Sequence, residues 1–253
     1  MKLLLLSIAL FSFLSISGCE QSDKPAVDSS IQLNEIQQQL NLLTKEVIGL
    51  RQQVADLDSA PSVKKKAQLV ELPLGNDVTV LGREDAEYAI VEYMDYQCPY
   101  CLRHAKKVLP ALKRKYIDSG LVKYIVRDFP LEFHAEAINA AKMARCSAKQ
   151  NKFSEAHGLL VSKARELNPA IYIDLANELA LDINAFGQCF NNPELTQAVN
   201  KSFTDATQLG VTGTPRFFIG KVEGERLVNV ISMSGARSID AFEKKLAIVF
   251  SEK

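Results

Sequence analysis

The stretch YMDYQCPYCLRHAKK, residues 93–107, contains two cysteines, Cys98 and Cys101, with two residues between them. It overlaps the end of an apolar run, residues 88–94, whose β-branched and aromatic content predicts a strand, and its second half has the composition of a helix. Such a pair can be a redox centre, half of a zinc site, or two buried thiols without a shared role. Its position at a junction between strand and helix favours the redox centre.

The expected helix gives the two thiols different chemistry. A thiol at the start of a helix lies beside unpaired backbone N–H groups and the positive end of the helix dipole, which stabilise its thiolate. We therefore predict that Cys98 is the nucleophile and that Cys101, one turn later, is the resolving thiol. Pro99 is compatible with this position because the first helical turn needs no N–H from it.

Metal sites fit the sequence poorly. Structural zinc usually needs a second closely spaced pair of Cys or His, and no such pair follows in the sequence. A c-type haem would need His directly after Cys101, where the chain has Leu102. We therefore expect no metal and no other cofactor. We expect His104 to be exposed on the helix. His134 and His157 are assigned by default to packing or surface roles.

The predicted elements around the cysteine pair alternate between strand and helix. A long stretch of helical periodicity separates the first strands from the last two. In chain order, we expect strands at 77–82 and 88–94, a helix at 98–115, a strand at 121–129, helices from 134 to about 207, strands at 215–220 and 227–235, and a closing helix from Ser238. This order predicts an α/β domain with helices packed on a central sheet.

The chain begins in the manner of an exported protein. Residues 1–18 combine one early positive charge, a short apolar run and small residues, which is typical of a cleaved export signal. The residues that end in Ser17, Gly18 and Cys19 resemble the lipobox of bacterial lipoproteins, which implies cleavage before Cys19 and lipid on its thiol. An ordinary signal peptide that ends near a cysteine is the alternative. Glu20, where the lipoprotein families use Asp for retention in the inner membrane, implies the outer membrane.

Residues 31–58 show a heptad pattern. Eight apolar residues occupy the a and d positions of four heptads: Leu33, Ile36, Leu40, Leu43, Val47, Leu50, Val54 and Leu57. This regularity predicts a coiled coil that joins copies of the chain into a dimer or a trimer. The alternative is an amphipathic helix folded back on its own domain, since Leu42 and Ile48 widen the apolar stripe. Composition assigns residues 19–30 to a flexible tether and residues 59–69 to a linker.

Charge and cysteine content limit the partners and the compartment. The chain has 30 basic and 30 acidic residues and no basic tract longer than Lys64–Lys66, so no nucleic-acid partner is expected. The chain has five cysteines, and if Cys19 carries lipid, export places the other four in an oxidising space where disulfides persist. The two cysteines not yet assigned, Cys146 and Cys189, are either bridged to each other or two separate buried thiols.

Three separated motifs, VEYMDYQCPYC, RDFPLEFHAEA and LGVTGTPRFFIG, resemble the DsbA-like thiol–disulfide oxidoreductases of the thioredoxin superfamily. The resemblance implies a thioredoxin fold in residues 70–253 with a helical domain inserted at about 134–207. It also implies that Pro215 is a cis proline that faces the cysteine pair. Thr214, the residue before it, would present backbone groups to an extended substrate.

The resemblance implies further roles around the cysteine pair. Glu92, six residues before Cys98, is implied to be a buried acid that moves protons to and from Cys101. The alternative is an outward-facing carboxylate on the strand; we favour burial because Glu92 interrupts an otherwise apolar run. Pro99 and Tyr100, between the cysteines, are expected to tune the redox poise and to contact substrate.

The expected activity is disulfide exchange in exported proteins, by isomerisation, oxidation or both. Thr214 resembles the residue found before the cis proline in the isomerases DsbC and DsbG, and a coiled coil would hold several active sites together. A pure dithiol oxidase is the close alternative, and a structural or metal-holding lipoprotein is an alternative of another class. We expect a periplasmic, lipid-anchored protein with a membrane redox partner, either reductant or oxidant. Many relatives carry a second disulfide in the helical domain, which favours a Cys146–Cys189 bridge.

Overall fold

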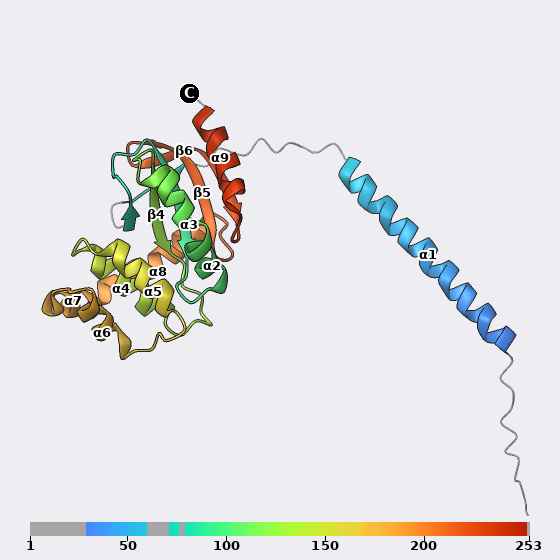
Figure 1. The fold of residues 1–253 in the computed structure, drawn as a ribbon, viewed down its shortest axis with the longest axis horizontal. Coiled ribbons are helices and arrows are strands. Elements are labelled where there is room, and N and C mark those ends of the chain that lie inside the picture. Colours follow the sequence, from blue (N-terminus) through green and yellow to red (C-terminus); the bar gives the residue numbers. More distant parts are fainter. Residues whose placement is uncertain (1–28, 60–70, 76–78, 252–253) are drawn as a thin grey trace, which may run out of the picture. The chain divides into compact units, whose positions relative to one another are not determined.

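The computed structural model describes residues 29–59, 71–75 and 79–251, which fall into two compact units divided between Val63 and Lys64 (Figure 1). The first unit contains one long helix, α1 (Ser29–Ser59). Its large apolar side chains are all exposed to solvent within residues 33–52, and those on the heptad positions include Leu33, Leu40 and Leu43. No helix in the described ranges is long and apolar enough to cross a membrane. The coiled coil stays a prediction, on a segment that is helical throughout.

Several expectations concern residues outside these ranges. The signal peptide, Cys19 and residues 20–28 of the predicted tether precede the described part of the chain. Almost all of the predicted linker, residues 60–69, also lies outside it. These assignments therefore stay predictions from sequence.

The second unit is built on a mixed sheet. Its strands run in the order β1-β6-β5-β3-β4-β2, with β3 and β4 parallel and the other neighbouring pairs antiparallel. All seven residues of the central β3 are buried. The strand bounds are β1 Leu72–Pro73, β2 Thr79–Leu81, β3 Tyr88–Met94, β4 Val122–Asp128, β5 Arg216–Glu223 and β6 Arg226–Ser234.

Helices cover the sheet and form the insertion between β4 and β5 (Figure 1). Their bounds are α2 Pro99–Lys107, α3 Leu109–Leu112, the π-helical turn η1 Lys113–Ile117, α4 Ala137–Ala148, α5 Phe153–Lys163, α6 Ile171–Glu178, α7 Ile183–Phe190, α8 Pro193–Gln208 and α9 Ile239–Ser251. The α/β class, the thioredoxin fold and the inserted helical domain are confirmed. The single helix expected at 98–115 is wrong: it breaks at Val108, because Pro110 lacks the N–H for a continuous ladder and clashes with the preceding turn.

The alternation of side chains along β3 separates two cores. Ile90 and Met94 lie on one face, in a cluster with Phe242 of α9. Ala89 and Tyr93 lie on the other face, in a cluster that includes residues of α8. Because successive strand residues point to opposite faces, residue 92 shares the face of Ile90, which is the face that α2 covers.

A disulfide joins Cys146 of α4 to Cys189 of α7, with their Cα atoms 5.8 Å apart. The two residues are separated by 43 positions. A loop of this length, closed covalently, stabilises a fold by about 4 kcal/mol in the chain-entropy model. The bridge connects helices of the insertion, so it can hold that domain together while the Cys98–Cys101 pair changes its redox state.

Candidate active site

The two cysteines of the motif lie where β3 meets α2. Cys98 is the residue before the helix, in extended conformation with φ −70° and ψ 119°, and Pro99 begins the first turn. The Cys98 carbonyl accepts the N–H of Leu102 at 3.0 Å, as a residue at the start of a helix should. Both thiols are free, and both are buried: Cys98 is 4% exposed and Cys101 is 0% exposed.

The two thiols differ strongly in acidity. A hydrogen bond from the Cys101 thiol lowers the pKa of Cys98 to about 5, and contacts to Thr214 and to the backbone N–H groups of Tyr100 and Cys101 add to this effect. Burial raises the pKa of Cys101 well above its usual range, and the hydrogen bond it gives to Cys98 raises it further. Cys98 is therefore a thiolate at neutral pH while Cys101 keeps its proton.

We expect the alkylation rate of reduced Cys98 by iodoacetamide to reach half its maximum near pH 5 and to be level by neutral pH. Only the thiolate reacts, and the low pKa of Cys98 means that raising the pH beyond neutral adds no more thiolate. An ordinary cysteine, with a pKa of about 8.5, would still gain rate at that point. Rate against pH, followed by mass spectrometry, measures this. In Cys101→Ala the midpoint should move upward, and a wild-type midpoint above pH 8 would contradict the assignment.

Glu92 lies fully buried on the face of β3 that α2 covers. Tyr124 of β4 donates its hydroxyl to Glu92 Oε2 at 2.6 Å, while Oε1 has no hydrogen-bond partner among the described residues. Burial raises the pKa of Glu92 to about 8; the Tyr124 hydrogen bond lowers it and the nearby Cys98 charge raises it. A carboxyl with this pKa can both hold and release a proton near neutral pH.

His104 is buried, with 0% exposure, so its predicted exposed position is wrong. His104 lies three residues after Cys101 on α2, which places both side chains on the inward face of the helix. Its Nε2 is 2.9 Å from the Tyr124 hydroxyl oxygen, and burial lowers the pKa of His104 to about 3. The Tyr124 hydroxyl uses its one proton to donate a hydrogen bond to the ionised Glu92. Its oxygen can therefore only accept from His104, so the neutral imidazole carries its proton on Nε2 and donates to Tyr124.

The Thr214–Pro215 peptide bond is cis. Its Thr214 carbonyl oxygen is 3.6 Å from Cys98 Sγ and accepts a weak hydrogen bond from the Cys98 thiol when that thiol is protonated. Thr214 and Pro215 belong to the segment before β5, so the structure brings them to cysteines more than a hundred residues earlier in the chain. Tyr100, by contrast, is 55% exposed on α2, with the Arg103 guanidinium 5.0 Å from its ring centroid.

Buried polar contacts fix the segment that leads into α2. Asp95 is 2% exposed and accepts hydrogen bonds from the N–H of Gln97 at 2.7 Å and of Leu131 at 2.9 Å. The His134 ring nitrogen Nδ1 is 2.8 Å from the same carboxyl group. These contacts tie the segment before Cys98 to the loop after β4, so His134 has a packing role.

A second Tyr–His pair lies beside the motif. The Tyr96 hydroxyl is 3.1 Å from His157 Nδ1, and both residues are buried. This pair joins the segment before the cysteines to α5 of the helical insertion. The default packing role for His157 agrees with this position.

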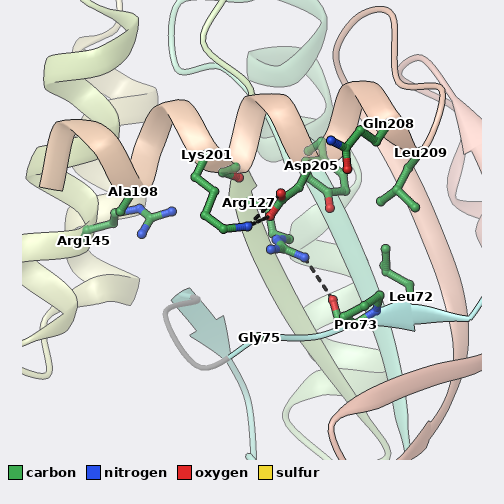
Figure 2. A pocket seen from close by; sticks show the side chains of 12 residues that line it. Leu72, Pro73, Gly75, Arg127, Arg145, Ala198, Lys201, Asp205, Gln208 and Leu209 are labelled. Atoms are coloured by element: carbon green, nitrogen blue, oxygen red, sulfur yellow. Dashed lines mark hydrogen bonds and ion pairs between the residues drawn. The ribbon is translucent and has the colours of Figure 1, made fainter. Parts of the chain in front are cut away.

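A cavity of about 470 Å³ lies on the other face of the sheet, between β1, β4 and α8 (Figure 2). Its charged side chains are largely engaged: Lys201 pairs with Asp205 at 2.8 Å, and Arg127 donates to the Pro73 carbonyl at 3.0 Å. Tyr93, which follows Glu92, lines the cavity from the strand itself. The sheet therefore separates this cavity from the cysteine pair, and we assign it no part in the exchange.

The cysteines could be found by motif and Glu92 through the family resemblance, whereas neither indicated Tyr124 or His104. Tyr124 reads as one more aromatic residue in a β-strand, and only its register beside β3, where it pairs with Ile90, places its hydroxyl near Glu92. The three-residue spacing between Cys101 and His104 places both on one face of the helix. It predicts burial of His104 only once it is known that this face is buried.

The family model described as Thioredoxin matches residues 75–236 of the chain. The "Putative protein-disulfide oxidoreductase" of Rickettsia conorii is 29% identical over 191 residues, which cover 71% of this chain and 67% of that protein. A protein of the same description from Rickettsia prowazekii is 26% identical over 226 residues, covering 83% of this chain and 81% of its own length. The crystal structure of Wolbachia pipientis alpha-DsbA1 superposes with a TM-score of 0.63 at 26% identity, covering 72% of this chain and 94% of that one.

Proposed function

Because the chain belongs to the thioredoxin family, as a DsbA-like oxidoreductase, we propose that it exchanges disulfides in exported proteins within the periplasm. Cys98 would act as nucleophile, Cys101 as resolving thiol and Glu92 as their proton carrier. The observation that carries the proposal is the unequal acidity of two thiols at one helix start, above a buried carboxyl whose pKa is raised to about 8.

Oxidation of a substrate starts from the Cys98–Cys101 disulfide. A substrate thiolate attacks Cys98 Sγ, the Cys98–Cys101 bond breaks, and Cys101 leaves as a thiolate that takes a proton from Glu92. A second substrate thiolate then attacks the substrate sulfur of the mixed disulfide and releases Cys98 as a thiolate. Two electrons pass from substrate to enzyme, and the low pKa of Cys98 makes it a good leaving group.

Isomerisation uses the same groups without net redox change. The Cys98 thiolate attacks a substrate disulfide and forms a mixed disulfide, and the displaced substrate thiolate is free to attack elsewhere. A different substrate thiolate then releases Cys98. Thr214 beside the thiolate could pair with the backbone of the extended substrate in either direction of reaction.

We further propose the domain organisation and assembly given by the sequence. Residues 1–18 would be a lipoprotein signal peptide, Cys19 the lipid anchor in the outer membrane, residues 19–30 a tether and residues 59–69 a linker. Residues 31–58 would form a coiled coil with a second or third copy, which the exposed heptad side chains of α1 support. A membrane redox partner would restore the working state of Cys98 and Cys101.

Recovery of activity from a scrambled multi-disulfide protein tests isomerisation. We expect the chain from Glu20 to restore the scrambled substrate about tenfold faster than a chain from Gln68, because linked active sites act at a raised effective concentration on one substrate. Oxidation of a reduced peptide, which needs one active site, is the internal control and should be equal in both. If both chains fail on the scrambled substrate and oxidise the peptide equally, the protein is a pure oxidase and the coiled coil serves only to tether it.

A further inference from the structure

A groove of about 640 Å³ lies between the end of β6 and α9. Four cationic side chains line it: Arg216, Arg237, Lys244 and Lys245. Met233 and Ile248 contribute apolar surface, and Ile248 is 44% exposed although its side chain is large and apolar. No acidic side chain lines the groove within the described residues.

The positive charge of the groove is not neutralised by the protein itself. In the described part of the chain, none of the four cations forms an ion pair, although ion pairs occupy many cations elsewhere on the surface. Arg216 donates to the hydroxyl of Ser232 at 2.9 Å and to that of Ser234, and Arg237 Nε donates to the Ser234 carbonyl at 2.8 Å.

The acidic residues of α9 leave this charge in place. Glu243 pairs with Lys115 on η1, away from the groove, and Asp240 is exposed one turn before Lys244 without lining the groove. The chain has equal numbers of acidic and basic residues overall. A groove with four unpaired cations is therefore a local feature that an anionic partner would complement.

One residue that lines the groove, Arg216, is close in the chain to the segment beside the cysteine pair. Arg216 directly follows Pro215, and its Cα is no more than about 7 Å from that of Thr214 by chain geometry. The Thr214 carbonyl is in turn 3.6 Å from Cys98 Sγ. An extended polypeptide whose cysteine reaches Cys98 can therefore continue past Thr214 into the groove, at about 3.3 Å per residue.

We propose that this groove binds an acidic segment of the substrate polypeptide, next to the cysteine that exchanges with Cys98. The inference rests on the proposed function and adds to it the class of substrate that the enzyme prefers. Cations hold the carboxylates of the segment, while Met233 and Ile248 pack against its aliphatic side chains. Attraction between the opposite charges raises the rate of encounter and selects acidic over basic substrates.

The test compares reduced dithiol peptides that differ only in the residues beside one cysteine, which are aspartates, serines or lysines. Each peptide dithiol gives two electrons and two protons to the Cys98–Cys101 disulfide of the full chain, and the second-order rate constant is measured by stopped flow. At low salt we expect the aspartate peptide to react about tenfold faster than the serine peptide, with a ratio that falls toward one as ionic strength rises. The lysine peptide should be the slowest.

The double variant Lys244→Glu and Lys245→Glu should bring the aspartate-to-serine ratio to one or below. The matched control, Lys149→Glu with Arg165→Glu, makes the same charge change at exposed positions of the helical insertion and should keep the ratio. Equal rates for all peptides in wild type would overturn the groove proposal and leave the exchange activity standing. Failure to react with any peptide would overturn the proposed function, and the groove proposal with it.

The last experiment measures binding of the wild type and the double variant to vesicles that contain an anionic phospholipid. If wild type binds them and the Lys244→Glu, Lys245→Glu variant does not, while peptide ratios are the same in both proteins, the groove is a lipid surface and the proposal is wrong. If the variant changes only the peptide ratio, the groove is a polypeptide site.

Discussion

Cys98→Ala should lower the rate of disulfide exchange with a dithiol peptide at least about a thousandfold, to the background of the uncatalysed reaction. The remaining thiol, Cys101, is fully buried and has a pKa well above its usual range, so it cannot replace the lost thiolate. The measurement is the oxidation rate of the peptide with the full chain at neutral pH. A variant that keeps a tenth of the wild-type rate would contradict the assignment of the nucleophile.

Cys101→Ala is the matched control because it removes a thiol of the same motif and leaves Cys98 in place. With a disulfide substrate, the Cys98 thiolate of this variant should attack one sulfur, displace the other as a thiolate and form a mixed disulfide that persists, since no second enzyme thiol is present to resolve the bond. The trapped species is visible on a non-reducing gel. If neither variant affects the function of the protein in the cell, the chain is a structural lipoprotein and its fold does no exchange.

Glu92→Gln should slow the step in which Cys101 leaves or attacks by about a hundredfold at neutral pH. Burial raises the pKa of Glu92 to about 8, so below pH 8 the carboxyl is mostly protonated and can give its proton to the leaving Cys101 thiolate. Above pH 8 this proton is lost. The wild-type rate of that step should therefore show an inflection near pH 8, which Glu92→Gln lacks.

Tyr124→Phe tests whether the buried hydrogen bonds set this inflection. The Tyr124 hydroxyl lowers the pKa of Glu92, so its removal should move the inflection to higher pH while the enzyme stays active. Tyr96→Phe removes a buried hydroxyl that also contacts a histidine, His157, without donating to Glu92, and should leave the inflection in place. An inflection that survives in Glu92→Gln would assign it to another group.

The sequence predicted what depends on local pattern. The strand before Cys98, the helix start at Pro99 and the helical stretch before β5 all follow from apolar periodicity and proline placement. The resemblance added Glu92 and Pro215, whose roles no local pattern carries. It also implied that Pro215 faces the cysteine pair, although these residues are far apart in the chain.

The parts that the sequence did not predict depend on tertiary packing. β1 has two residues, and its pairing of Leu72 with Leu227 joins segments that are far apart in the chain, so no local periodicity indicates it. His104 is a polar residue of a kind usually found at the surface. It is buried because the helix face that carries Cys101 meets the sheet. The groove cations come from β5, from the turn after β6 and from α9, so only the fold brings Arg216 next to Lys244 and Lys245.

The near-complete burial of Cys98 has a consequence for when the enzyme can work. With 4% exposure, Cys98 offers little surface to a rigid, folded partner, and the Thr214 carbonyl lies 3.6 Å from its sulfur. An extended chain can lie along the Thr214 backbone and bring a cysteine into contact. We therefore expect the enzyme to act on its clients before they fold, and to lose access to each cysteine as the client folds around it.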